Sequence, residues 1–456
     1  MTKNIVSSIV ALGLLSGCAY DVASPQQTID KTEQSIKTPS RYKNAPYNKL
    51  AIDGWLKRFN DYTLIKLVKE AQQNNPDLQL AYSDIKHAMA LLKLSESNLY
   101  PNMDFRGNYA YNNYNISNSH HDAGNFVFSI NWEPDIWGKL STQREADYEY
   151  MLSKQALYCY AKESLAANTA KAWFMLSSDK MIYNFNKQVV SLHKKAQSLI
   201  SKQAQIGQGN YRDVHMIQGM LASSQNDAVT AMQKMQLDTR ALEILVGRYP
   251  SNALKAHKLA HLPSKVPSKV PLDLLNTRPD IIAAKYRVAE AFHNVEVANK
   301  LRLPSINISL QGGYDIIQDS LAKAIGGIFM PIFDAGAVQS HIDAATAQQQ
   351  AAIASYKAVV LNAYKEVEDA YALEKQLASR YRYISRMTNE FYQAYKMTNE
   401  NYKIGQGTLL DVLQVQTQWI NAKIAKIQIQ KDRLLNRVNL YLALGGHYSN
   451  KKATNK

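Results

Sequence analysis

Hydrophobic and polar positions alternate along parts of this 456-residue chain with the period of a β-strand. Over residues 103–111 apolar and aromatic side chains occupy the odd positions, and polar or charged ones most of the even positions. The same alternation recurs over 126–133 and 306–311. A period of two predicts strands with one apolar and one polar face. We therefore expect two β-hairpins, over about residues 102–134 and 305–333, of which the last strand is rich in glycine and alternates poorly.

A second period, of seven residues, marks long helices. Residues 138–206 and 336–404 contain no convincing helix breaker, and about 69 helical residues measure roughly 100 Å. Glycine-rich turns, 207–210 and 405–408, lead into return helices over 211–247 and 409–444. Sustained heptads indicate coiled-coil packing. The heptad residues are Ile182, Val189 and Ala196, interleaved with Phe185, Leu192, Leu199 and Ile206; then Val214, Leu221, Ala228, Met235 and Leu242; and finally Leu413, Ile420, Ile427, Leu434 and Tyr441.

The chain also repeats itself. Pro76 to Leu78 matches Pro279 to Ile281 at an offset of 203 residues, and later segments match at an offset of 198. The difference of five residues falls between Pro101 and Gly138 and predicts a longer hairpin loop in the first copy. Such self-similarity indicates a protein built from two copies of one unit. The segments matched at 198 are Asp135 to Gly138 with Phe333 to Gly336, Gln205 to Gly209 with Lys403 to Gly407, and Leu245 to Gly247 with Ala443 to Gly445.

Composition narrows the class of protein. The 53 Lys and Arg against 38 Asp and Glu give a net charge of +15, which raises nucleic acid as a partner. Two cysteines exclude a disulfide framework and a four-cysteine zinc site. No stretch beyond the N-terminus approaches the roughly 20 apolar residues of a membrane-spanning helix, which excludes a helical-bundle membrane protein.

The N-terminus predicts export. Lys3 precedes an apolar stretch over residues 5–15, and Leu15 to Cys18 then resembles a lipobox, in which the cysteine is acylated. An ordinary signal peptide that contains a cysteine is the alternative. Ala19, where an Asp commonly retains bacterial lipoproteins in the inner membrane, predicts the outer membrane. Export also removes most of the case for nucleic acid. The second cysteine, Cys159, is predicted to be a buried thiol in a helix.

Strand number predicts an oligomer. Strands of roughly ten residues suit a tilted crossing of an outer membrane, although the edge of a soluble β-sandwich is the alternative. Four strands cannot close a barrel. Two chains would supply eight, which fill their own interior, whereas three supply twelve and enclose water. We therefore expect a trimer.

Five segments together carry a family resemblance, and their order and spacing make it specific. The chain resembles the outer membrane factor family, the TolC-like efflux ducts, and within it the lipoprotein branch of OprM and NodT. The segments are the lipobox ending at Cys18, Trp132 to Gly138, Leu274 to Ile281, Pro331 to Gly336, and Tyr402 to Val412.

This resemblance implies a mixed α/β membrane protein with two repeats per chain. The implied homotrimer has a 12-stranded β-barrel on an α-helical coiled-coil tunnel in the periplasm, is lipid-anchored in the outer membrane and has no cofactor beyond the lipid on Cys18. It implies a periplasmic adaptor and an inner-membrane RND-type transporter as partners. The expected division is a signal peptide over 1–17, an anchored segment and belt over 18–60, repeat one over 61–248, an equatorial linker over 249–272, repeat two over 273–446 and a tail over 447–456.

The turns between long helices hold the candidate gate. Asp213 and Asp411 each fall three residues into a return helix, where a carboxylate also simply stabilises the free N–H groups of a helix start. By resemblance they match carboxylates that ring the closed tunnel end, and Tyr402 matches a gate tyrosine. Gly407 stands where one branch has Arg, and Gln414 where it has a second Asp. We therefore expect a looser or hydrogen-bonded gate.

The tips of the same turns are candidate adaptor contacts, because exposed glycine-rich turns let partner helices approach closely. Their alternative is a plain turn role. The residues are Gly207, Gln208 and Gly209 in the first turn and Gly405, Gln406 and Gly407 in the second.

We find no enzyme motif and no nucleotide-binding loop, and His120 to Asp122 is best read as part of a solvated loop. The expected function is a gated, passive exit duct for drugs, toxic compounds or metal ions. A type I protein-secretion channel and a non-conducting coiled-coil envelope lipoprotein are the alternatives. Much of the positive charge is expected on the solvated outer face of the helices, at Lys187, Lys194, Lys195 and Lys202 and at Lys423, Lys426, Lys431, Arg433 and Arg437.

Overall fold

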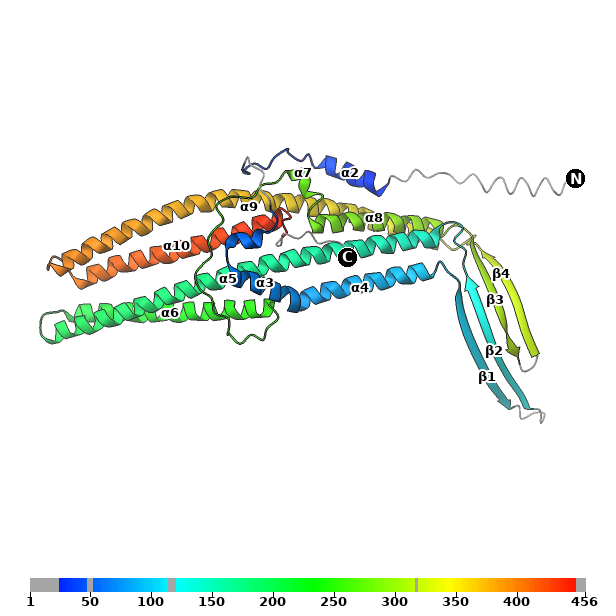
Figure 1. Ribbon diagram of the computed structural model, residues 1–456, viewed down its shortest axis with the longest axis horizontal. Coiled ribbons are helices and arrows are strands. Elements are labelled where there is room, and N and C mark those ends of the chain that lie inside the picture. Colours follow the sequence, from blue (N-terminus) through cyan, green and yellow to red (C-terminus); the bar gives the residue numbers. More distant parts are fainter. Residues whose placement is uncertain (1–23, 47–51, 114–119, 316–318, 448–456) are drawn as a thin grey trace.

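The protein is long and narrow, with a sheet at one end and the turns of four long helices at the other (Figure 1). The computed structural model describes residues 24–46, 52–113, 120–315 and 319–447. Cys18 and the predicted signal peptide therefore lie outside the described residues, as does all of the tail beyond His447. Among the described residues, no helix has the length and apolarity needed to cross a membrane.

The two halves of the chain fold into the same succession of elements. An N-terminal segment precedes them with α2 (Pro25–Ser35) and the 3₁₀ helix η1 (Trp55–Phe59). The first half comprises α3 (Tyr62–Asn74), α4 (Pro76–Ser97), β1 (Asn102–Asn113), β2 (His120–Trp132), α5 (Lys139–Gln205) and α6 (Tyr211–Leu245). The second comprises α7 (Pro271–Leu274), α8 (Pro279–Lys300), β3 (Ser305–Asp315), β4 (Asp319–Phe329), α9 (Ala337–Lys403) and α10 (Leu409–Ala443).

The two hairpins join into one antiparallel sheet in the order β1-β2-β3-β4. Residues that lie directly opposite share a face, so Phe105 meets Phe128 and Ile130 meets Leu310 on an exposed apolar face. On the opposite face the Asn131 amide donates to Asp104 at 3.0 Å. The Asn131 side-chain oxygen accepts from the Ser309 hydroxyl at 2.8 Å. The sheet therefore has one apolar and one polar side, and β1 and β4 are its edges.

The strand that alternates poorly in the sequence, β4, pairs continuously with β3 but carries apolar side chains on both faces. Ala324 and Ile328 lie opposite Leu310 and Ile306 on the apolar face, and Gly326 lies between them. Ile325 and Phe329 lie on the other face, opposite Ser309 and Ser305, so the strand has no clean alternation although its backbone pairing is continuous.

Long helices pack as two antiparallel pairs, α5 with α6 and α9 with α10, and α5 also contacts α10 (Figure 1). On the distal half of α5, Val189 and Ala196 of the predicted heptad are buried. The interleaved residues Leu192, Leu199 and Ile206 are exposed. One chain therefore covers one of the two apolar stripes on this helix.

Two predictions about single side chains were wrong. Cys159 is only half-buried, because the helices packed on α5 leave part of its circumference open, as the exposed Leu157 also shows. Burial nevertheless raises the pKa of the Cys159 thiol. Arg437, expected on a solvated face, is 1% exposed and donates to the carbonyls of Pro263 at 2.6 Å and Lys265 at 2.9 Å. It ties the linker between the repeats to α10.

Both repeats use one device to close the middle of the molecule. Asn75 and Arg278, 203 residues apart, each precede the proline that begins a helix. The Asn75 amide donates to the Leu245 carbonyl at 3.0 Å. The Arg278 guanidinium donates to the Ala443 carbonyl at 3.2 Å. The end of each return helix is thereby fastened to the start of its own repeat.

Glycine is required where these helix ends meet. Gly247 has φ +77°, and a Cβ there would lie 2.6 Å from the Asn74 carbonyl oxygen. The match of Leu245 to Gly247 with Ala443 to Gly445 therefore has a steric basis.

Replacing Arg278 by Ala should destabilise the protein by about 3–5 kcal/mol, because Asp280 and Glu366 would lose their shared, buried cationic partner. Asn75→Ala, which leaves a carbonyl unpaired, should cost about 1–3 kcal/mol. Chemical denaturation of the detergent-solubilised chain measures both. Arg382→Ala, at an exposed arginine, is the control and should change stability by less than about 0.5 kcal/mol; equal effects of all three variants would contradict the proposed role.

Candidate functional site

The two turns at the far end of the long helices have the same backbone. Gly207 and Gly405 have φ +79° and +78° and end α5 and α9 in the left-handed conformation. The Gln208 N–H donates to the Gln203 carbonyl and the Gln406 N–H to the Asn401 carbonyl, both at 2.8 Å. This is the Schellman arrangement, which satisfies carbonyls that a helix end leaves free.

Each tip needs a second glycine, for a different reason. A Cβ on Gly209 would lie 2.9 Å from the Ala204 amide nitrogen, so the first turn has no space for a side chain. Gly407 has φ +149°, a conformation that residues with a side chain rarely adopt. The Gln208 and Gln406 side chains between the glycines are exposed. These glycines therefore fix narrow tips that display one amide each.

The return helices begin with different caps. In α6 the Asn210 side chain accepts from the Arg212 N–H at 2.9 Å. In α10 Thr408 and Asp411 form a reciprocal capping box, in which Asp411 accepts from the Thr408 N–H at 3.0 Å and from its hydroxyl at 2.7 Å. The hydrogen bonds from the Thr408 hydroxyl and N–H lower the pKa of the Asp411 carboxyl.

The two predicted gate carboxylates therefore have different surroundings in the chain. Asp213 is 26% exposed and pairs with the Arg212 guanidinium at 3.3 Å. Asp411 is exposed and its carboxylate is held by its own helix start. Both lie three residues into a return helix at the same end of the molecule (Figure 1).

An apolar cluster holds the two tips together. Val214 and Ile217 of α6 pack in one buried cluster with Leu413 of α10. The neighbouring Gln414 is exposed, and Tyr402 is half-buried in the last turn of α9. Within the described part of the chain the Tyr402 hydroxyl has no hydrogen bond, so a single chain brings the gate residues to one end without joining them. The apolar positions beside the polar ones, Leu409 and Leu413, are the signal by which the sequence could have shown this cluster.

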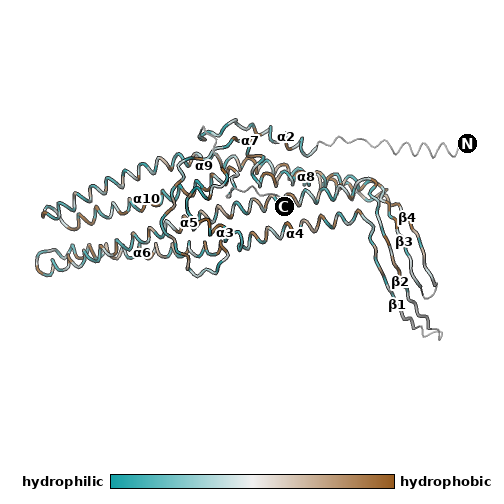
Figure 2. The backbone as a smooth tube through the Cα atoms, in the orientation of Figure 1, coloured by the Kyte–Doolittle hydropathy of each residue, from teal (hydrophilic) through white to brown (hydrophobic). Residues whose placement is uncertain are grey.

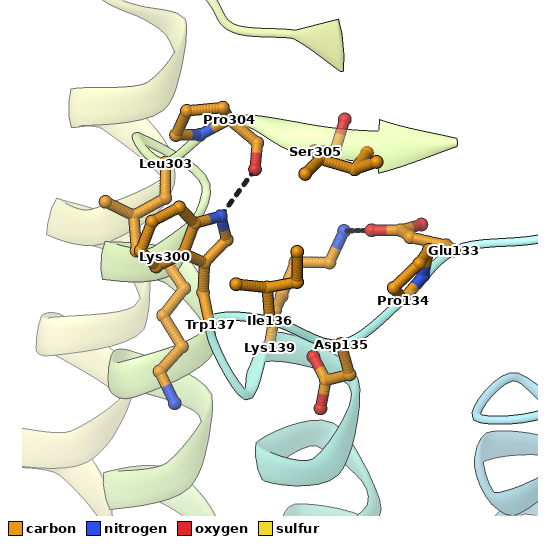
Figure 3. A pocket seen from close by; sticks show the side chains of 11 residues that line it. Glu133, Pro134, Asp135, Ile136, Trp137, Lys139, Lys300, Leu303, Pro304 and Ser305 are labelled. Atoms are coloured by element: carbon orange, nitrogen blue, oxygen red, sulfur yellow. Dashed lines mark hydrogen bonds and ion pairs between the residues drawn. The ribbon is translucent and has the colours of Figure 1, made fainter. Parts of the chain in front are cut away.

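The other candidate segment, Trp132 to Gly138, forms the joint between sheet and helices (Figure 3). The Trp137 indole N–H donates to the Pro304 carbonyl at 2.7 Å, across the two repeats. Lys139 and Glu133 form an ion pair of 2.6 Å. The cavity among these residues measures about 20 Å³, room for a single water at most. This segment is therefore a structural joint and not a ligand site.

A carboxylate in this joint starts the longest helix of the first repeat. Asp135 accepts from the Leu140 N–H at 2.9 Å and from the Ser141 N–H at 2.8 Å. Burial acts to raise the pKa of the Asp135 carboxyl, but hydrogen bonds from the Ser141 hydroxyl and from these N–H groups outweigh it and lower that pKa. Asp334 caps α9 in the same way, accepting from the Val338 N–H at 2.8 Å. In the sequence, Asp135 and Asp334 were noted only as members of segments that resemble the family, and their role as helix caps was not predicted.

Across the residues that the structure describes, no three His, Cys, Asp or Glu side chains are placed to hold a metal ion. The His120 to Asp122 segment lies in β2 rather than in a loop, at the end of the hairpin farthest from the helices (Figure 1).

Comparison with known proteins identifies the architecture. The profile of the family described as "Outer membrane efflux protein" matches residues 67–248 and 270–446. The chain is 25% identical over 442 residues to the cation efflux system protein CusC of Escherichia coli O6:H1, covering 92% of each chain. It is 23% identical over 471 residues to the probable efflux pump outer membrane protein TtgC of Pseudomonas putida, covering 98% of this chain and 96% of the relative.

The fold is that of solved outer membrane channels. The MtrE channel of Neisseria gonorrhoeae superimposes with a TM-score of 0.80 at 23% identity, covering 92% of this chain and 98% of that one. The predicted TolC-like fold is thereby confirmed.

Thr408→Ala should loosen the start of α10 by about 1 kcal/mol, because it removes the cap and half of the capping box. Hydrogen exchange of the first turn of α10, followed by mass spectrometry, measures the change. Thr398→Ala, at a half-buried threonine inside α9 that caps no helix, serves as the control. Unchanged exchange at residues 409–412 would show that the turn glycines alone hold the tip.

Proposed function

Because this chain belongs to the outer membrane efflux protein family, we propose that it is the passive exit duct of a tripartite pump. It conducts small molecules from the periplasm to the exterior and catalyses no reaction. The observation that carries this proposal is the match of the family profile to both repeats, over an architecture in which a two-faced sheet is joined to two 67-residue helices. Relatives named for cation efflux and for toluene efflux support cations or organic toxicants as the cargo.

The assembly is a homotrimer with a twelve-stranded barrel. Four strands with unpaired edges at β1 and β4 need the strands of other copies to close. Of the four long helices in one chain, α6 and α9 are the two at the flanks, because α5 and α10 pack between them. Both flanking helices carry exposed apolar residues that one chain leaves uncovered. These are Met216, Leu237 and Ile244 on α6, Tyr383 and Met397 on α9, and Ile404 directly after α9.

The tip turns form the gate and the docking site. In a trimer, Asp213 and Asp411 place six carboxylates around the periplasmic mouth, and Tyr402 and Gln414 lie beside them. Such a ring favours cations and lets them block conduction. The exposed tips, Gly207 to Gly209 and Gly405 to Gly407, bind a periplasmic adaptor that links the duct to an inner-membrane RND-type transporter.

The membrane anchor is a lipid on Cys18. In the sequence α2 begins at Pro25, seven residues after Cys18, and this helix packs on α8 and α9. The acylated cysteine would therefore be tethered by only a few residues to the body of the protein, which supports a lipid-anchored outer-membrane protein with a large periplasmic part.

The full chain reconstituted in a planar bilayer should form ion channels that divalent cations block. Asp213→Asn with Asp411→Asn should weaken that block at least tenfold, because it removes the six mouth charges. Asp77→Asn, a carboxylate at the exposed start of α4, should leave the block unchanged. The absence of any channel would indicate a non-conducting spacer, and an unchanged block would remove these aspartates from the gate.

Tyr383→Asp with Met397→Asp should dissociate the trimer in detergent, because each copy would bury charges against the apolar face of α6. The mass of the protein–detergent complex, measured by light scattering, gives the copy number. Leu199→Asp makes the same kind of change on α5. Because α5 lies between α6 and α10 of its own chain, this variant should preserve the trimer. A wild-type monomer, or dissociation by all three substitutions alike, would contradict this interface.

A further inference from the structure

An ion cluster lies between α5 and α6, halfway along the tunnel wall and far from the tips. The Lys234 ammonium of α6 lies 2.6 Å from the Asp179 carboxylate of α5 and 2.8 Å from the Asp238 carboxylate of its own helix. The Asp179 side chain is only 5% exposed, whereas Lys234 is half-exposed. Two carboxylates therefore share one cation, and the deeper one is almost out of water.

The fold does not require this cluster, as the second repeat shows. At an offset of 198 the three residues correspond to Leu377, Asp432 and Asn436. Leu377 is buried in α9, just as Asp179 is in α5. A leucine satisfies the same position by packing alone, whereas a buried carboxylate costs desolvation that only good partners offset. The charges of the first repeat are therefore an addition to the fold.

The surroundings leave the cluster open to protons. Asp179 and Lys234 line a groove of about 350 Å³ between α5, α6 and α10, and so water reaches them. The other ionisable side chains that line it are Asp227 from α6 and Lys431 from α10, and Lys431 is ion-paired with Asp432 at 3.3 Å. His193 lies farther along the same wall and borders the neighbouring cavity with Asp227.

We propose that Asp179, Lys234 and Asp238 form a proton-operated clasp, which tightens the α5–α6 pair when Asp179 takes up one proton from the periplasm. In the charged state the two carboxylates repel one another and depend on Lys234. In the protonated state the Asp179 O–H donates to the Asp238 carboxylate, and Lys234 stays paired with Asp238. Both carboxyl groups are then satisfied without a buried, uncompensated charge.

The titration falls in a range that a periplasm experiences. Burial, and then the hydrogen bond with Asp238, raise the pKa of Asp179 to about 6. Burial also acts to raise the pKa of Asp238, but hydrogen bonds from Asp179 and Lys234 outweigh it and lower that pKa. A carboxyl whose pKa is higher in the packed state binds a proton more tightly there. Acid therefore stabilises the clasp, and the gain is lost as pH rises through 6.

Hydrogen exchange of the assembled full-length protein in detergent tests the clasp. After correction for intrinsic exchange rates, opening of the distal α5 and α6 segments should fall about tenfold between pH 7 and pH 5, as one proton per chain binds. Asp179→Asn should remove this dependence. Asp179→Leu introduces the residue that the second repeat has at this position and should also remove the pH dependence. This variant serves as the test if the asparagine of Asp179→Asn packs poorly.

Asp227→Asn is the matched control, because it removes a carboxylate from the same groove without touching the clasp. It should retain the tenfold change. A flat wild-type profile, or a tenfold change that survives both Asp179 substitutions, would falsify the clasp. Loss of the change in Asp227→Asn would assign the titration to Asp227 instead. Because the measured quantity is helix opening, the result stands apart from whether the protein conducts.

Discussion

The pairing of each 67-residue helix with its return helix is the interaction on which the rest of the structure depends. A helix of that length needs partners along its whole apolar side; the 35-residue α6 covers part of α5, and α4 and α8 also pack against it. Covering it fixes where the turns lie, and both turns lie at one end of the molecule (Figure 2). Asp213 and Asp411 follow these turns in the first turns of α6 and α10. The same geometry leaves α6 and α9 with uncovered apolar residues, which makes the single chain incomplete.

The two repeats share their backbone and differ in the chemistry placed on it. Arg278 does with a guanidinium what Asn75 does with an amide, because both reach the carbonyl at the end of a return helix. Asn210 and Thr408 cap equivalent helices with different groups. Where Leu377 packs in one repeat, Asp179 binds a lysine in the other. Duplication thus supplied a common backbone on which a site could arise in one repeat and be absent from the other.

Local pattern predicted much of the fold and part of the candidate site. Strand alternation at Phe105 and Phe128, the turn glycines Gly207 and Gly405, and the heptad position of Val189 each depend on a residue and its near neighbours. Such features are visible in the sequence because period and backbone conformation are local properties. The tip caps could be predicted for the same reason, since Thr408 and Asp411 are only three residues apart.

The sequence by itself therefore determined the strands, the paired long helices, the repeat and the chemistry of the turns. Tertiary structure alone decided which charged residues are buried and with which partners. Arg437 reads as a surface cation, yet its partners are linker carbonyls about 170 residues away, and the Asp179 partner lies 55 residues away on another helix. Desolvation and hydrogen bonding depend on these distant neighbours, and no periodicity in the chain encodes them.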